Sequence, residues 1–343
     1  MASRCASPTG VSPCRRRSRR ELADLGRERD PLPRVAPGER FTALVDEPFA
    51  DVGIALASQA TACGARSVAV IVPDTARPLG PVHEQLLASL VETDAICFWF
   101  QEIHDGEFAP FRQPLYARAR ETSTRIAFGG QLDRSMLEHE MAADYAGVQA
   151  RCAALVAAIG DATTIRVTTP GGTDCTFDVS GRSWISDDGD LSAPAAFGNL
   201  PAGEIFISPL RHGAQGRCVI DRSIAFAEIG LVNEPFTLVF EAGRIVGVEG
   251  GHEAEIVWRE IKAAGAGADI VAELGIGTND SARITGSVIT DEKVLGTAHV
   301  AFGDNSLSYG GDNHASIHVD GVMADATIEA DGRTVLDRGV LSA

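Results

Sequence analysis

The chain has 343 residues, of which 45% are hydrophobic and 6% aromatic. This composition is typical of a globular protein, and the length is enough for two domains of ordinary size. The net charge of −17 is uneven: residues 1–40 hold 10 arginines against 5 acidic residues, and the rest holds 20 basic against 42 acidic residues. Because so acidic a body repels nucleic-acid phosphates, we expect no nucleic-acid partner. No apolar run reaches about 18 residues, so we expect no membrane partner either.

Residues 1–40 are predicted to form a disordered, arginine-rich arm, because they show no hydrophobic period. They also lack the apolar core of a secretory signal. The seven cysteines are an odd, scattered set without a C-x-x-C pair. Such a set favours reduced thiols and a cytoplasmic location.

Residues 41–130 alternate short apolar runs with helix-like segments. The strand-like runs are FTALVD, SVAVIVP, DAICFWF and RIAFGG, and the helix-like segments are DVGIALASQATACG, GPVHEQLLASLVET and the stretch near PLYARARETS. Continuous apolar strands separated by helices are typical of a parallel sheet that is covered on both faces. We therefore predict a Rossmann-like α/β domain over residues 41–160. No G-x-G-x-x-G motif follows the first strand, so no dinucleotide site is expected.

Residues 133–160 have the pattern of one long helix. Apolar residues recur at steps of three and four, at Leu137, Met141, Tyr145, Val148, Cys152 and Leu155. This spacing marks one face of a helix, and Gly160 suits its C-terminal end. We expect this helix to link two domains.

After residue 160 the pattern changes to strand pairs around glycine turns. The segments are TIRVTTPGGTDCTFDV, FTLVFEAGRIVGVEGG and TIEADGRTVLDRG, with one helix-like segment, HEAEIVWREIKAAGAG, between the last two. Tight turns of this kind join antiparallel strands. The predicted fold class is therefore α/β: the Rossmann-like parallel domain is followed, over residues 161–343, by a mostly antiparallel α+β domain.

Candidate metal ligands are concentrated in this second domain. In the segment HASIHVD, His318 and Asp320 are two residues apart, so they share one face of a strand. His299 lies nineteen residues upstream, and Glu204 and Glu273 interrupt otherwise apolar strands. A buried carboxylate is costly unless it is paired or bound to a metal. Two glutamates, two histidines and one aspartate indicate a site for two divalent ions, with carboxylates balancing the charge.

Four segments in series resemble the thermophilic aminopeptidase family that is typified by aminopeptidase T. They are NLPAGE (199–204), AELGIGTN (272–279), DEKVLGTAHVAFGDN (291–305) and GGDNHASIHVDGVM (310–323). The resemblance implies a homodimeric enzyme with two divalent metal ions, Co²⁺, Zn²⁺ or Mn²⁺, acting on a peptide or small amide with a free amino terminus. It also implies that Glu204, Glu273, His299, His318 and Asp320 are the metal ligands and that His314 is not one.

The same resemblance suggests catalytic roles for three residues. Glu273 would bridge the two ions, and Glu204 is a candidate to shuttle a proton. The family's tyrosine beside the metals falls on Ser306 in this register, and Tyr309, three residues further on, is the candidate that replaces it. The function predicted from the sequence is therefore a dinuclear metallo-aminopeptidase.

Two alternatives use the same residues. The chain also resembles 2,5-dihydroxypyridine dioxygenase, which holds one iron with two histidines and an aspartate. The resemblance implies that the relative has a histidine at the position of Glu273. His299, His318 and Asp320 could form such a triad here, which would leave Glu204 and Glu273 as unexplained anions. The other alternative is hydrolysis of a small amide that is not a peptide.

Overall fold

The structure is a computed structural model that describes residues 35–306 and 309–342. Most of the predicted N-terminal arm lies outside the described residues. Among the helices that are described, none has both the length and the apolar character needed to cross a membrane.

The first half is built on a five-stranded parallel sheet, in the order β2-β1-β3-β4-β8. Its strands are β1 (Arg40–Asp46), β2 (Arg66–Val72), β3 (Ala95–Trp99), β4 (Arg125–Gly129) and β8 (Phe197–Asn199). Helix α2 (Ala50–Ala62) packs on one face, and α3 (Glu84–Leu90) and α4 (Gln113–Thr122) pack on the other. The predicted parallel sheet with both faces covered is confirmed.

The predicted helix over residues 133–160 is wrong in its first part. Short 3-10 turns occupy Arg134–Leu137 and Glu140–Ala142, and a helix, α5, begins only at Tyr145 and runs to Ile159. Leu137 and Met141 pack on the parallel sheet, whereas the apolar residues of α5 pack in the second half. The residues with helical spacing therefore belong to two different hydrophobic cores. A single straight helix could not place its apolar residues in both, so the segment is interrupted before Tyr145.

The second half is a sandwich of two sheets. All described strand pairings within these two sheets are antiparallel. The eight-stranded sheet has the order β14-β13-β10-β6-β5-β18-β19-β20, and the seven-stranded sheet has the order β12-β11-β17-β16-β15-β9-β7. The first consists of β5 (Thr164–Thr168), β6 (Asp174–Asp178), β10 (Ala214–Ile220), β13 (Phe236–Glu241), β14 (Arg244–Glu249), β18 (Thr327–Ala330), β19 (Arg333–Asp337) and β20 (Val340–Leu341). The second consists of β7 (Ile185–Asp187), β9 (Glu204–Ile207), β11 (Ser223–Ile224), β12 (Gly230–Leu231), β15 (Val271–Gly277), β16 (Ala298–Gly303) and β17 (His318–Met323).

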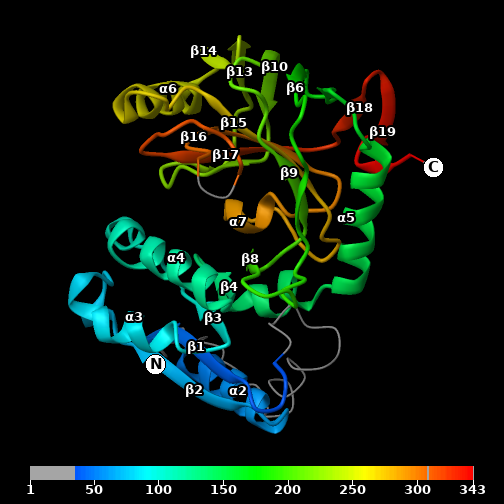
Figure 1. Cartoon of the computed structure of the whole chain (residues 1–343). Coiled ribbons are helices and arrows are strands. Elements are labelled where there is room, and N and C mark those ends of the chain that lie inside the picture. The colour runs from blue at the N-terminus through cyan, green and yellow to red at the C-terminus, as the bar shows by residue number, and fades with distance from the viewer. Residues whose placement is uncertain (1–34, 307–308, 343) are drawn as a thin grey trace, which may run out of the picture.

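One face of each sheet is apolar, and these faces enclose the main core together with α5 and α6 (His252–Ala264). The other face of the seven-stranded sheet is directed toward the parallel half, and the short helix α7 (Val288–Asp291) lies between them (Figure 1). The predicted fold class, a parallel α/β half followed by a mostly antiparallel half, is confirmed.

The two halves are connected through β8. This strand follows β7 in the chain, yet it pairs with β4 of the parallel sheet. Only four residues, 200–203, separate the end of β8 from the start of β9. The carboxyl edge of the parallel sheet, where α/β proteins commonly bind ligands, therefore adjoins the seven-stranded sheet. The domain limits at residues 160 and 161 remain a prediction.

Candidate metal centre

Strand register brings all five predicted ligands to one face of the seven-stranded sheet. In β16 and β17, Ala301 pairs with Asp320 and Gly303 pairs with His318. Directly opposed residues of antiparallel strands share a face, so Asp320 and His318 lie on the same face as Ala301 and Gly303. His299 lies on this face too, because it is two residues before Ala301 in β16. The same rule adds Glu273, which is opposite Ala301, and Glu204 of β9, which is opposite Gly277.

Glycines on this face provide the space for the functional side chains. Gly275 is opposite His299, and a Cβ atom added to Gly275 would lie 2.0 Å from the His299 Nε2 atom. A Cβ atom at Gly277 would lie 2.1 Å from the carbonyl oxygen of Val294. The imidazole of His299 and the backbone after α7 can therefore lie directly on β15.

The hydrogen bond at His318 fixes which ring nitrogen faces the centre. Its Nδ1 atom is 2.6 Å from the backbone carbonyl oxygen of Asp304, so Nδ1 carries a proton and donates it. Its Nε2 atom is 3.2 Å from Glu273 Oε2 and 3.4 Å from Asp320 Oδ2. The lone pair of a neutral imidazole would thus face two carboxylates, an arrangement that requires a cation.

A divalent metal ion fits this requirement. Donor atoms of Glu273, His318 and Asp320 lie within 4.8 Å of one another, and so do those of two overlapping sets, Glu204–Glu273–His299 and Glu292–His299–Asp320. Ligand atoms about 2.0–2.2 Å from one ion are separated by distances of this order. Glu273 Oε2, His318 Nε2 and Asp320 Oδ1 are buried and make no hydrogen bond within the described part of the chain. Without a metal, burial would lower the pKa of His318, but the charges of Asp320 and Glu273 outweigh it and raise that pKa well above its usual value.

The other two histidines that the sequence analysis considered, His299 and His314, have different positions. His299 is fully buried, with Nε2 3.2 Å from Glu204 Oε2 and 3.5 Å from Glu273 Oε1. It shares no donor set with His318 among the described residues, so the considered triad of His299, His318 and Asp320 does not form a compact group. His314 is exposed over 84% of its side chain and belongs to none of these sets.

Three charged residues that the sequence reasoning did not assign complete the centre. Lys293 is fully buried after α7, and its ammonium group contacts Glu204, Glu292 and Asp187. Burial raises the pKa of Asp187 to about 7 and that of Glu292 to about 8, against the opposing charge of Lys293. The signal was present in the segment DEKVLG, where a lysine follows two acids inside an otherwise apolar stretch, but only the fold shows that it is buried.

Aromatic side chains form one boundary of the centre. The ring of Tyr309 stacks on the imidazole of His318, with 4.4 Å between the centroids and 18° between the planes. Phe206 of β9 packs against the same tyrosine, with 5.5 Å between the centroids. Arg182 donates a hydrogen bond to the backbone carbonyl of Gly310, next to Tyr309. Tyr309 therefore lies beside the predicted ligands, although its catalytic role remains a prediction.

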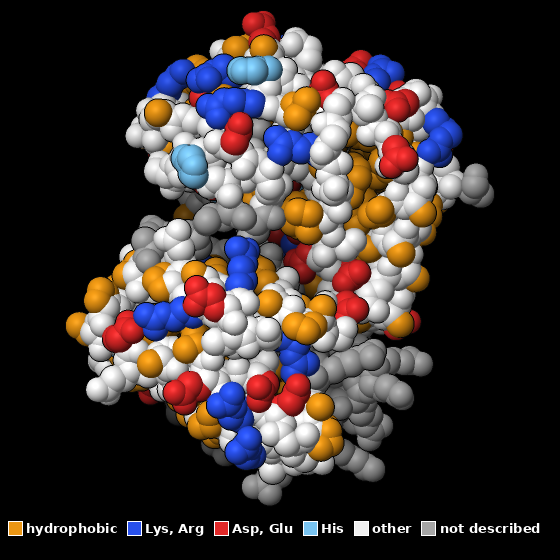
Figure 2. Space-filling model, viewed as in Figure 1, with side chains coloured by type: hydrophobic (Ala, Val, Ile, Leu, Met, Phe, Trp, Pro, Cys, Tyr) orange, Lys and Arg blue, Asp and Glu red, His pale blue; other side chains and the backbone are white. Residues whose placement is uncertain are grey.

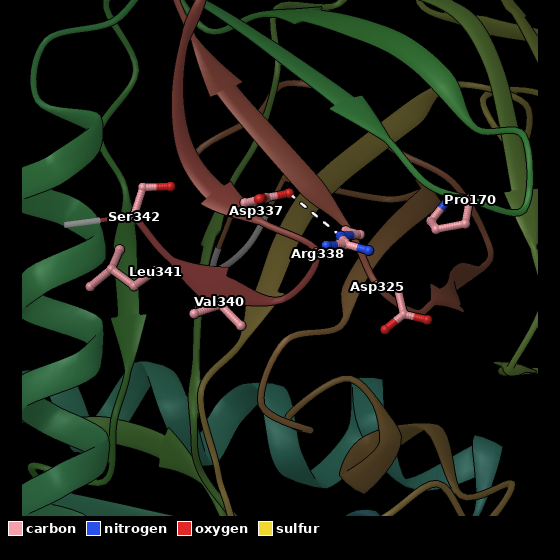
Figure 3. Close-up of a pocket in the computed structure, with 7 residues that line it drawn as sticks. All are labelled: Pro170, Asp325, Asp337, Arg338, Val340, Leu341 and Ser342. Atoms are coloured by element: carbon pink, nitrogen blue, oxygen red, sulfur yellow. Dashed lines mark ion pairs between the residues drawn. The ribbon is translucent and has the colours of Figure 1, made fainter.

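The surface is hollowed in more than one place. Figure 2 shows a hollow between the two halves of the molecule, with charged side chains at its rim. A separate hollow of about 580 Å³ lies at the β20 edge of the eight-stranded sheet, where Asp337 and Arg338 form an ion pair (Figure 3). None of the residues that line this second hollow belongs to the candidate centre, so it is a distinct feature.

The fold and the centre define a two-part protein with a buried histidine–carboxylate cluster on a β-sheet. A sequence model of the family NicX, 2,5-dihydroxypyridine 5,6-dioxygenase, matches residues 22–343. Because the match covers nearly the whole chain, the chain belongs to this family, and it is an enzyme of a dioxygenase family. A comparison with curated proteins gives no match.

Two solved structures share the fold at low sequence identity. The 2,5-dihydroxypyridine dioxygenase from Pseudomonas putida KT2440 is similar with a TM-score of 0.79 and 19% identity, over 96% of this chain and 99% of that one. AmpT from Thermus thermophilus is similar with a TM-score of 0.65 and 18% identity, over 95% of this chain and 99% of that one. The likeness to aminopeptidase T is therefore one of fold.

The predicted aminopeptidase function is wrong. The family match favours a dioxygenase over a hydrolase or protease. The error has a physical origin. The quoted motifs describe a cluster of metal-binding side chains on a shared fold, and such a cluster does not by itself specify the reaction.

Proposed function

We propose that this chain is a ring-cleaving dioxygenase that uses one ferrous ion and acts on a hydroxylated N-heteroaromatic ring of the 2,5-dihydroxypyridine type. The observation that carries the proposal is the close approach of Glu273 and Asp320 to His318 Nε2, while the other ring nitrogen, Nδ1, donates to the backbone carbonyl of Asp304. Membership of the dioxygenase family supports it.

The donors suit iron with one departure from the relative. The resemblance to 2,5-dihydroxypyridine dioxygenase implies two histidines and an aspartate as iron ligands. This chain instead offers one imidazole and two carboxylates, Glu273 and Asp320. Two carboxylates neutralise a divalent ion, and three donors on one side leave other coordination positions open. A bound ferrous ion supplies the one-electron chemistry that dioxygen needs to react with an aromatic ring.

The side chains around the metal ligands can bind the ring, hold a proton and exclude water in this proposal. Tyr309 and Phe206 offer an aromatic surface beside His318, against which a flat ring can pack. His299 and Glu204, 3.2 Å apart, form an acid–base pair that can hold the proton of a ring hydroxyl. Burial of the cluster keeps bulk water away from these groups.

The test is oxygen consumption by protein that has been loaded with metal anaerobically. Protein reconstituted with Fe²⁺, Mn²⁺ or Zn²⁺ is mixed with 2,5-dihydroxypyridine, with singly hydroxylated pyridines and with catechol. We expect uptake of one O₂ per dihydroxylated ring, loss of the ring's ultraviolet absorbance, and about one iron bound per chain, with Zn²⁺ inactive. Iron-loaded protein that consumes no oxygen with any of these rings would contradict the proposal.

A further inference from the structure

Lys293 is the only lysine in the carboxylate cluster, and its surroundings are unusual. The sequence contains only two lysines, Lys262 and Lys293, among its 30 basic residues. Lys262 is exposed and lies over the ring of Trp258, whereas Lys293 is fully buried. An ammonium group has three donors on a compact charge, unlike the flat fork of arginine. At Lys293 three carboxylates surround these donors.

The contacts of Lys293 divide the carboxylates into two groups. Its Nζ atom donates a hydrogen bond to Glu204 Oε1 and lies 2.9 Å from Glu292 Oε1 and 3.5 Å from Asp187 Oδ2. No described contact joins Lys293 to Glu273 or Asp320. Glu204 and Glu292 each belong to one of the donor sets that overlap the centre. They could therefore reach a metal ion, but both carboxylates already contact the ammonium group of Lys293.

We propose that Lys293 withholds Glu204 and Glu292 from the metal and so keeps coordination positions open for the reaction. This inference rests on the metal centre of the proposed function. With Lys293 present, the ion takes its ligands from Glu273, His318 and Asp320, and Glu204 faces His299 and the lysine. Without the ammonium charge, Glu204 and Glu292 lose the lysine that compensates their burial, and coordination of the metal is their nearest replacement for it.

The decisive variant is Lys293→Met, which keeps a long apolar side chain and removes the charge. Calorimetric titration with Mn²⁺ is expected to show binding at least roughly tenfold tighter than in the wild type, because a repelling charge is lost and carboxylate ligands are gained. With Co²⁺ as the probe, the visible bands are expected to weaken, since added carboxylates raise the coordination number. Oxygen consumption by the iron-loaded variant should fall although the iron is held more tightly.

Matched variants separate this effect from general disturbance. Lys262→Met removes the exposed lysine and should leave the Mn²⁺ affinity unchanged, and Lys293→Arg retains the charge and should stay closer to the wild type than Lys293→Met. The double variant Glu204→Gln/Lys293→Met removes one freed ligand and should return the affinity toward the wild-type value. Unchanged or weaker Mn²⁺ binding in a folded Lys293→Met protein would overturn the inference.

A second measurement decides the matter if Lys293→Met does not fold. Because Glu204 is not a ligand in this scheme, Glu204→Gln in the otherwise unchanged chain should alter the Mn²⁺ affinity by no more than about threefold, and a loss above about tenfold would overturn the inference. The proposed function fails in a distinguishable way. In that case the wild-type protein itself binds no metal ion, or binds iron without consuming oxygen.

Discussion

The two ends of the buried carboxylate cluster differ in how the negative charge of the carboxylates is compensated. At one end, Lys293 supplies a permanent cation to Asp187, Glu204 and Glu292. At the other end, Glu273 and Asp320 face the Nε2 atom of His318, which is an acceptor when neutral. The lysine end is therefore complete within the protein, whereas the histidine end requires a proton or a metal ion. The difference indicates which end is structural and which end is reactive.

The largest effect is expected from breaking the histidine end. His318→Ala removes a ring nitrogen that faces two carboxylates, so metal affinity should fall on the order of 100-fold or more and activity should be lost. His314→Ala is the matched control, since its exposed ring belongs to no donor set, and it should keep most of both. Metal content after desalting and oxygen uptake measure the two effects. Loss of metal in the control with retention in His318→Ala would refute the ligand assignment.

The next effect concerns stability at the lysine end. In metal-free protein, Lys293→Met removes the cation that three buried carboxyl groups share, so the free energy of unfolding should fall by about 3–5 kcal/mol. Urea denaturation measures this change, and Lys262→Met should alter it by less than about 0.5 kcal/mol. Adding Mn²⁺ should restore more stability to Lys293→Met than to the wild type, because tighter binding stabilises the folded state more. Equal stability of the two metal-free variants would show that the lysine end is not structural.

The histidine end should also respond to pH. Burial would lower the pKa of His318, but the carboxylates of Asp320 and Glu273 outweigh it, so the pKa lies well above its usual value. Metal-free protein therefore holds a proton on Nε2 at neutral pH, and a metal ion must displace it. Apparent metal affinity should rise with pH by up to about tenfold per unit for each displaced proton, until the pH exceeds that raised pKa. Titrations in buffers of different ionisation enthalpy count the released protons, and a pH-independent affinity would contradict this.

The smallest effect tests the space that the sheet leaves for His299. A Cβ atom at Gly275 would lie 2.0 Å from His299 Nε2, whereas one at Gly247 would have no atom within 4 Å. Gly275→Ala should therefore destabilise the protein by about 1–3 kcal/mol, since the imidazole must move. Gly247→Ala should be neutral or stabilising by up to about 1 kcal/mol. Thermal melting of both variants provides the comparison, and equal melting temperatures would count against the packing of His299 on β15.

Residue spacing within single segments was enough to predict most strands and the candidate metal donors. Period-two alternation in β17 predicts a shared face for His318 and Asp320, and the apolar runs of β1 and β3 predict a buried parallel sheet. These features are decided by side-chain direction within a single strand. The hairpins at Asp331-Gly332 and Ala242-Gly243 are local in the same sense, because both residues of each turn adopt positive φ.

The way in which these elements combine became visible only in the folded chain. Folding brought Asp187 and Glu204, which are distant in sequence, to Lys293 and its neighbour Glu292. It also delayed the start of the apparent helix to Tyr145, because the preceding residues pack in the other core. It also grouped Glu273, and not His299, with His318 and Asp320. Such groupings depend on strand register across a sheet, which is fixed by long-range pairing and by the space at Gly275 and Gly277. A periodic pattern within one segment carries no information about those partners.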